Sequence, residues 1–513
     1  MSTAVCGSAD MAGSLDIVIQ NGRVIDPAAG INEICSVGIE GAKIVDISAG
    51  HLDGKYTINA DGCIVTPGLI DFHTHLFEGG SLYGIHPDCL LSQGVTAAVD
   101  AGTSGSAGFE AFYRSIIQNS ILTVKAFISL GATGLCDPKH HQSYEKSGVN
   151  LERLRTLKER YSDTVLGIKV AMSRHDVGEL GLEPLLTAVE TAECLGHDMR
   201  VCVHSTDPPC SSEELLSVLR KGDILCHCYH GTGPCILDEK GYVREAYRDA
   251  RRRGVVFDMA NGINHFCHES ALGAIRQGFL PDVISSDMVS FAYGISRRNR
   301  SLPYVMSKLM AMGMELTDII RAVTQTPAEL MGMSKEIGTL MTGAWADVAI
   351  LRVENCPVVF EDAKMQTYRG ETLLCPQMTI KNGQVVFFQN KFQELAGFGR
   401  INYRSPQRGI GHCNNCYVCA FWCADRVCNG DHFCNRAYCD PCYERKRLPS
   451  SIHCGTSGID LLPRYSDSAI RAGNYVCSGS FDIRYGCLDE HDWSWTSVCA
   501  RLLYCELFAP RPF

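Results

Sequence analysis

The fold of this chain is constrained most by a regular alternation of short apolar segments with segments of helical periodicity. The apolar segments are rich in β-branched residues, which is typical of buried strands. They lie at residues 64–70, 95–100, 123–130, 165–171, 200–204, 223–228, 255–259 and 283–286. Helical periodicity is found at residues 108–118, 151–160, 183–195, 211–220, 241–253 and 268–277, with 301–313 after the last strand.

Eight strand–helix units in roughly 270 residues predict an α/β fold, a (β/α)₈ TIM barrel, which typically needs about 250 residues. The chief alternative is an open, doubly wound sheet. That alternative is weakened because no Gly-x-Gly-x-x-Gly motif follows the first strand.

The two flanks of this alternating region have a different pattern, in which short strands follow one another through turns. The N-terminal flank contains Asn21-Gly22 and the C-terminal flank contains Asn382-Gly383, and Asn-Gly is a strong hairpin signal. We therefore expect both flanks to build one small β-sandwich. The predicted domains are residues 1–66 and 335–392 for the two parts of the sandwich, 67–334 for the barrel, and 393–513 for a C-terminal tail.

Composition excludes several classes of protein. The net charge is −10 over 513 residues and no basic stripe stands out, so we expect no nucleic-acid partner. No apolar run is long enough to span a bilayer, and the N-terminus lacks the pattern of a signal peptide. We expect a soluble cytoplasmic protein that acts on a small-molecule substrate, with a homo-oligomer left open.

The tail, residues 393–513, is rich in cysteine. The spacing from Cys413 to Cys423 resembles an iron–sulfur ligand run, although Ala424 stands where that run has proline. Cys439-Asp440-Pro441-Cys442 would suit a zinc knuckle. Weak periodicity favours a poorly ordered extension, or translation outside the ancestral frame. We expect a chain ending near Gln393 to fold, bind two metal ions and keep its kcat.

A metal site is predicted at the end of the first barrel strand. His73 and His75 follow an apolar run that ends in Pro67-Gly68. Side chains two residues apart on a strand point the same way, so both imidazoles should face one point. Imidazole nitrogens suit zinc or a similar divalent ion. Two surface histidines would also give this pattern by chance, but the preceding strand argues for the metal.

Further candidates lie at the ends of other predicted strands. They are Lys169, His204, His227 and Asp287. Each has an ordinary alternative: a hydrogen-bonded core histidine, a helix cap for the aspartate, or a lysine whose charged end reaches the surface. Because functional residues of barrels gather at strand ends, their joint occurrence favours a metal centre. Cys226 and Cys228 flank His227, and alternation predicts that both face the outer helices.

Several stretches of the chain resemble the amidohydrolase superfamily, and among its members the dihydroorotase-like deacetylase family of metallohydrolases. The resemblance covers roughly residues 14–390. It rests on Asn21-Gly22-Arg23-Val24-Ile25-Asp26-Pro27, Val65-Thr66-Pro67-Gly68-Leu69-Ile70-Asp71, Val99-Asp100-Ala101-Gly102, Gly167-Ile168-Lys169, Gly222-Asp223-Ile224-Leu225-Cys226-His227-Cys228, Ser285-Ser286-Asp287 and Gly343-Ala344-Trp345-Ala346-Asp347.

The resemblance implies two divalent ions, most often Zn²⁺. His73, His75 and Asp287 would hold the first ion, and His204 and His227 the second. Lys169, as N6-carboxylysine, would bridge both. A hydroxide between the ions would then attack the substrate carbonyl, and Asp287 would act as general base and then acid.

The expected reaction is hydrolysis of an N-acyl or O-acyl small acid, as in a deacetylase. Asn264 and His265, in the loop after the seventh strand, are candidates for substrate recognition. One alternative is a cyclic amide hydrolase, similar to dihydroorotases or hydantoinases. Another is a catalytically silent barrel that serves as a structural partner, against which the intact ligand set argues.

Overall fold

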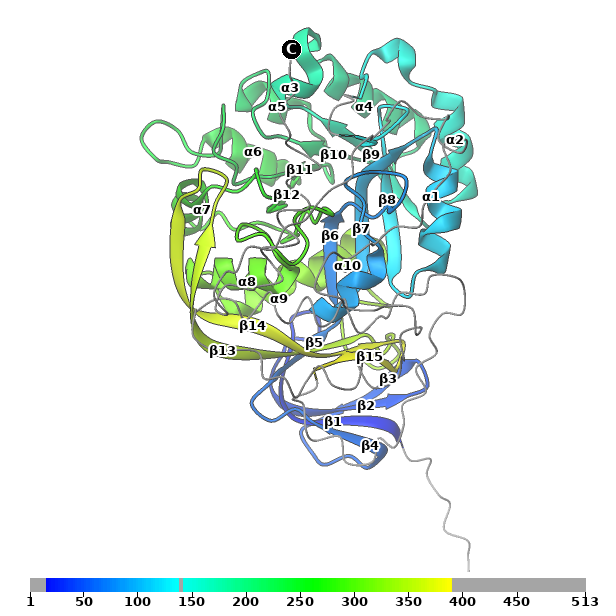
Figure 1. Ribbon diagram of the computed structural model, residues 1–513, viewed down its shortest axis with the longest axis vertical. Coiled ribbons are helices and arrows are strands. Elements are labelled where there is room, and N and C mark those ends of the chain that lie inside the picture. Colours follow the sequence, from blue (N-terminus) through cyan, green and yellow to red (C-terminus); the bar gives the residue numbers. More distant parts are fainter. Residues whose placement is uncertain (1–14, 138–141, 390–513) are drawn as a thin grey trace, which may run out of the picture. The chain divides into compact units, whose positions relative to one another are not determined.

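A computed structural model describes residues 15–137 and 142–389, all of which belong to one compact unit, Met1–Asn429. The predictions for the tail, 393–513, lie outside these residues. Two sheets organise the described part (Figure 1). One is a parallel sheet of seven strands that follow one another in chain order. They are β6 (Leu69–Thr74), β7 (Val95–Gly105), β8 (Thr123–Ser129), β9 (Val165–Ala171), β10 (Arg200–His204), β11 (Ile224–Cys226) and β12 (Val256–Asp258).

The eighth barrel segment is an irregular stretch, so the prediction of a regular strand at residues 283–286 is wrong. Val283 bridges Asp258 of β12, and Met288 bridges Thr74 of β6, so the stretch joins both edges of the seven-stranded sheet and closes it. Asp287, between these two bridges, has φ +52°, a conformation outside the extended region.

Helices cover the outside of the barrel (Figure 1). Those expected from periodicity are present, and two of them have the expected bounds, α2 (Leu151–Arg160) and α4 (Glu183–Leu195). In α4, Leu185, Ala188 and Ala192 form the buried face, as their helical spacing predicts. The others are α1 (Phe109–Ser115), α5 (Ser212–Val218), α6 (Glu245–Arg253), α7 (His268–Arg276) and α8 (Leu302–Ala311).

Shorter helical elements fill the connections. Two helices that the sequence patterns did not indicate follow α8, namely α9 (Leu316–Val323) and α10 (Gln325–Leu330). Ala328 and Leu330 of α10 belong to the hydrophobic cluster inside the barrel, so this helix covers the interior at one end. The remaining elements are α3 (Arg174–Val177), η1 (Pro87–Gln93), η2 (Ile117–Asn119), η3 (Lys146–Gly148) and η4 (Gly178–Leu180).

The second sheet takes strands from both flanks, in the order β15-β14-β13-β5-β1-β2-β3, with β4 paired to β1. Its two-layer arrangement as a sandwich stays a prediction. The strands are β1 (Leu15–Asp26), β2 (Ile31–Glu40), β3 (Lys43–Ser48), β4 (Gly54–Asn59), β5 (Ile64–Pro67), β13 (Val348–Glu361), β14 (Thr367–Lys381) and β15 (Gln384–Phe388).

The two Asn-Gly pairs of the flanks behave differently. Asn382-Gly383 turns between β14 and β15 with φ of +49° and +74°, so the predicted hairpin is confirmed. Asn21-Gly22 lies inside β1, where the pairing register with β2 shifts, and the predicted hairpin there is wrong. A Cβ on Gly22 would lie 2.5 Å from Val65 Cγ2, which shows that this glycine serves close strand packing at a bulge.

The first expected barrel strand divides between the two sheets at Gly68. β5 pairs with β1 and β13 of the flanking sheet, whereas β6 pairs with β7 of the barrel. The Gly68 N–H donates to Asp347 O at 2.8 Å. A Cβ at this position would lie 2.1 Å from Thr96 Oγ1, so only glycine fits where the chain passes from one sheet to the other.

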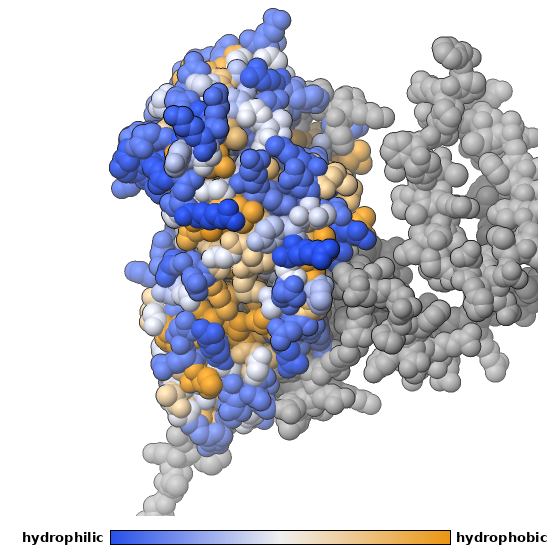
Figure 2. All heavy atoms as spheres, turned by 90° about the vertical axis from the view of Figure 1, so that its left-hand side faces the viewer, coloured by the Kyte–Doolittle hydropathy of each residue, from blue (hydrophilic) through white to orange (hydrophobic). Residues whose placement is uncertain are grey.

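The surface mixes charged and apolar areas. Figure 2 shows one face of the molecule, on which apolar side chains gather between polar areas. The long strand β13 contributes exposed Val353 and Val359. Among the residues that the structure describes, no helix is both long and apolar enough to cross a bilayer.

Candidate metal centre

Three of the predicted ligands meet at the carboxyl end of β6. His73 lies on β6 and His75 follows it, and both side chains are buried. Asp287 Oδ1 lies 3.2 Å from His75 Nε2 and 3.6 Å from His73 Nε2. Their ligand atoms lie within 4.8 Å of one another. We call these three residues the carboxylate set.

The backbone places Asp287 beside the histidines. Its N–H donates to His73 O at 2.7 Å, and its φ of +52° turns the side chain toward β6. Gly262, with the same φ of +52°, lies directly behind this carboxylate: a Cβ there would lie 2.5 Å from Asp287 Oδ2. The position of the carboxylate therefore depends on glycine at 262.

Both histidines of the carboxylate set have a partner on their second ring nitrogen. His73 Nδ1 lies 3.3 Å from Asp258 Oδ2, and His75 Nδ1 lies 2.8 Å from Thr103 Oγ1. Burial raises the pKa of Asp258 to about 7, against hydrogen bonds from Ser285 and the backbone that lower it. Such partners fix the ring orientation of ligating histidines and direct the other nitrogen toward the ion.

A second group consists of three imidazoles, His204, His227 and His265. Their ring centroids are separated by 4.4 Å (His204–His227), 4.7 Å (His204–His265) and 4.4 Å (His227–His265). We call them the imidazole set. His227 Nδ1 lies 2.7 Å from Ala260 O, which assigns the proton to Nδ1. The buried His227 Nε2 has no hydrogen-bond partner, so its lone pair is free for a cation.

The loop after β12 supplies the third imidazole. His265, predicted to contact substrate, shares the imidazole set, with its Nδ1 3.0 Å from Thr206 Oγ1. Asn264, predicted for the same role, is exposed and accepts a hydrogen bond from Arg298 Nη1 at 3.2 Å. The only sequence signal for His265 was its place after the seventh strand, which could not separate a ligand from a substrate contact.

Burial keeps these imidazoles neutral. It lowers the pKa of His73, His204 and His227 well below the usual value, and the pKa of His265 is lowered for the same reason. Neighbouring Lys169 and the other histidines add to the effect for the first three. A neutral imidazole offers a lone pair to a metal ion.

Lys169 of β9 lies at the inner side of the carboxylate set. Its Nζ is 3.2 Å from His73 Nε2. The close approach of β7 makes room for it: Gly102 has φ +80°, and a Cβ there would lie 2.5 Å from Lys169 Cβ.

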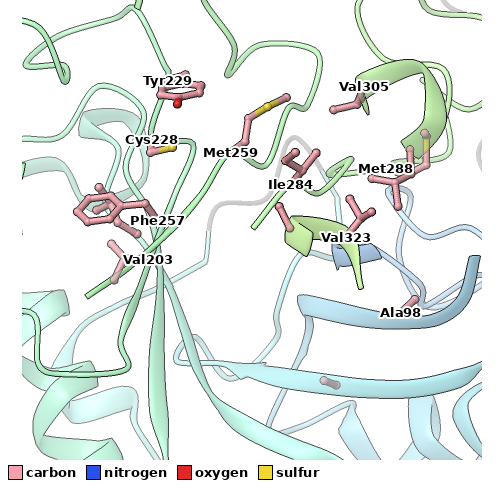
Figure 3. Packing of buried hydrophobic residues seen from close by; sticks show 14 of the residues in the cluster. Ala98, Val203, Cys228, Tyr229, Phe257, Met259, Ile284, Met288, Val305 and Val323 are labelled. Carbon is pink, nitrogen blue, oxygen red and sulfur yellow. The ribbon is translucent and has the colours of Figure 1, made fainter. Parts of the chain in front are cut away.

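Cys226 also faces the barrel interior, so the prediction that it packs against the outer helices is wrong. Its Sγ lies 3.9 Å from Lys169 Nζ. Within β11, Ile224 and Cys226 belong to the interior cluster and Leu225 to the outer one. His227, with φ +62°, breaks this alternation, so its side chain can face the interior next to that of Cys226. Cys228 faces the outer layer as predicted, near Tyr229 and Phe257 (Figure 3).

The donors present fit divalent metal ions. The carboxylate set offers two nitrogens and one oxygen, and the imidazole set offers three nitrogens. Zn²⁺ takes both types of donor in proteins. All six residues predicted as ligands thus lie in or beside these two sets, with His265 in addition.

Comparison with known proteins agrees with this geometry. Residues 299–387 match the sequence profile of the Amidohydrolase family. A deacetylase of Enterococcus faecalis is 30% identical over 382 residues, which cover 72% of this chain and 98% of the relative. A deacetylase of Agrobacterium fabrum is 29% identical over 333 residues, or 64% and 80% of the two chains.

Solved structures give the same assignment. An adenine deaminase structure superposes with a TM-score of 0.66 at 29% identity and covers 73% of this chain and 100% of its own. A dihydroorotase structure also has a TM-score of 0.66, at 26% identity, with 73% and 98% covered. With a barrel of this topology and relatives at this similarity, the chain belongs to the amidohydrolase superfamily.

Proposed function

We propose that this protein is a metal-dependent amidohydrolase of the deacetylase type, which hydrolyses an N-acyl or O-acyl small acid. The observation that carries the proposal is the presence of two adjacent donor sets, of which one is fully buried and includes a carboxylate. The similarity to deacetylases of two bacteria supports this reaction class.

In this proposal His73, His75 and Asp287 hold one divalent ion, and His204 and His227 hold the second. Lys169, carboxylated at Nζ, serves both, and Zn²⁺ is the ion that the donors favour. Bound ions of this kind polarise a carbonyl and lower the pKa of water from 15.7 to about 7. The carboxylated lysine supplies the anionic charge that the imidazole set lacks.

The residues of the chain then have separate tasks. Asp287 accepts a proton at Oδ1 or Oδ2 and returns it to the leaving nitrogen or oxygen, as general base and then acid. Asp258 and Thr103 hold the two histidine rings in place. Gly262 leaves the space in which the Asp287 carboxylate moves between its two proton-transfer partners.

A second candidate is hydrolysis of a cyclic amide. It is supported by the dihydroorotase structure that superposes on this chain. Both reactions attack a carbonyl carbon and release a nitrogen or oxygen, so the same donor sets serve either one. The difference lies in the substrate, which loop side chains select.

The test is a substrate panel with the purified full-length protein, combined with elemental analysis. The panel contains N-acetyl amino acids, acetylated hydroxy acids and cyclic ureides. Asp287→Asn protein that is purified by the same procedure controls for contaminating hydrolases. We expect close to two zinc equivalents per chain and turnover of an acylated acid. Active protein without metal would refute the proposal, and turnover of cyclic ureides alone would select the second candidate.

A further inference from the structure

A third group of metal-ligating atoms lies beneath the carboxylate set. It consists of His73, Cys202 and Cys226, whose ligand atoms lie within 4.8 Å of one another. The two Sγ atoms are 3.2 Å apart. All three side chains are buried, and the proposed reaction uses neither thiol.

The amine of Lys169 is surrounded by these three atoms. Its Nζ lies 3.2 Å from His73 Nε2, 3.8 Å from Cys202 Sγ and 3.9 Å from Cys226 Sγ. A cationic side chain therefore occupies a pocket made of one nitrogen and two sulfur donors. When Lys169 is displaced, the same donors can receive a metal ion.

We propose that His73, Cys202 and Cys226 form a separate site for a soft, thiophilic cation such as Cd²⁺ or Cu⁺. Thiolates select soft ions, and imidazole accompanies them in mixed sites. Two sulfurs bound to one tetrahedral zinc ion at about 2.3 Å lie about 3.8 Å apart, and the larger Cd²⁺ needs a somewhat greater separation. The two thiols reach that separation from 3.2 Å by small side-chain movements.

A cation bound at this site would inhibit the enzyme, and this consequence rests on the proposed function. His73 cannot ligate both ions through the same Nε2, and Lys169 loses the space that its amine occupies. A soft cation thus inhibits the enzyme because His73 and Lys169 are no longer available to the metal centre. Both thiols lose their protons to solvent when the cation binds.

The test uses Cd²⁺ with the full-length wild type, Cys202→Ala, Cys226→Ala and the matched control Cys228→Ala. Cys228 is equally buried but lies in the outer layer. Thiolate-to-cadmium absorption in the ultraviolet is compared between variants, so that the contribution of all other cysteines cancels. We expect wild type and Cys228→Ala to agree, and the other two variants to show less absorption.

The same variants are compared in activity. Loss of an outer-shell partner typically weakens metal binding about 10–100-fold, and loss of a direct ligand should cost at least as much. We therefore expect half-inhibition of Cys202→Ala and Cys226→Ala to need at least about tenfold more Cd²⁺ than wild type. Equal absorption and equal inhibition in all four proteins would overturn the proposal.

Anomalous diffraction from wild-type crystals soaked in Cd²⁺ gives an answer that needs no variant. A peak between His73 and the two sulfurs is the expected result. Peaks confined to the carboxylate and imidazole sets would overturn the soft-cation site while supporting the proposed function. Cd²⁺ at the three-residue site in a protein without hydrolase activity would support the site and refute the function.

Discussion

The carboxylate set and the imidazole set lie side by side but differ in charge. Asp287 gives the first set a negative ligand, whereas the second set has only imidazoles that burial keeps neutral. A divalent ion in the imidazole set would thus retain its full charge in a partly buried place, which is costly without an anion. This difference is the reason why the proposed function includes a carboxylated Lys169.

The two sets also differ in how the chain holds them. In the carboxylate set, His73 lies at the end of β6 and His75 directly after it, and Asp287 is tied to His73 by a backbone hydrogen bond. In the imidazole set each ring comes from a different segment. The residues 261–265 connect both sets, since Gly262 contacts Asp287 and His265 completes the three imidazoles.

Asp287→Asn removes the negative charge of the carboxylate set but keeps the size of the side chain, and it should have the largest effect on kcat. The amide cannot accept the proton, so we expect kcat to fall by about 10²–10⁴-fold, the usual share of general acid–base catalysis. Much of the bound metal should remain. Steady-state kinetics and elemental analysis on the same sample measure both.

Asp223→Asn is the control for this variant. Asp223 is also buried, but it binds Arg220 and the Val201 N–H away from the metal centre, so kcat should stay near the wild-type value. Activity of Asp287→Asn equal to that of the control would remove Asp287 from the mechanism.

His227→Ala tests whether the imidazole set depends on a complete set of donors. We expect this variant to lose the ion of the imidazole set and to retain the ion held by His73, His75 and Asp287, because only that set carries its own anion. Elemental analysis should show about half the wild-type metal. Retention of both ions would show that His265 replaces His227.

Gly262→Ala perturbs the connection between the sets without removing a ligand. The new Cβ would lie 2.5 Å from Asp287 Oδ2, and a shift of the carboxylate by about 1 Å can cost about 10²-fold in rate. Gly278→Ala is the matched control, since Gly278 has φ +72° but no atom within 4 Å of a new Cβ.

Both glycine variants carry the same backbone strain, so kcat of correctly folded protein should distinguish them. We expect Gly278→Ala to lose stability with nearly unchanged kcat. Equal kcat for the two variants would mean that Asp287 has more freedom than the structure shows.

Lys308→Met should have the smallest effect on kcat, because it concerns only the support of residues 261–265. Lys308 Nζ is buried and donates to Asn261 Oδ1 at 2.7 Å. Burial lowers its pKa to about 7, although Asp362 raises it in part. Unfolded lysine has a pKa of about 10.4, so between these values the unfolded chain binds more protons, and stability rises with pH.

Denaturant unfolding at several pH values checks this prediction. Wild type should gain up to about 1.4 kcal/mol per pH unit between about pH 7 and 10 relative to Lys308→Met. Lys364→Met, which replaces an exposed lysine, should follow wild type. A parallel pH dependence of wild type and Lys308→Met would show that Lys308 stays charged when folded.

Regular elements were predictable because local periodicity and burial agree. The bounds of α2 and α4 and the position of His73 and His75 follow directly from spacing. Errors arise where one residue leaves the extended region. The φ of His227 turns its imidazole to the same side as Cys226, and Asp287 leaves the extended region directly after the expected eighth strand; neither angle can be read from residue types.

Contacts between distant segments were the other limit. The bulge at Asn21-Gly22 depends on Val65, which approaches from another strand. His265 joins His204 and His227 only because the loop after β12 meets the ends of β10 and β11. Pattern analysis placed the three histidines at or after the ends of barrel strands but could not assign their neighbours.

The passage of one segment through two sheets at Gly68 has a consequence for folding cooperativity. Opening of the flanking sheet at β5 would pull on β6, and with it on His73, because no flexible linker separates the two strands. The amides of β5 and β6 should therefore exchange with solvent hydrogen as one unit, at the free energy of global unfolding. The flanking sheet, which contributes no residue to the carboxylate set, would thereby set how long the strand that carries His73 stays closed.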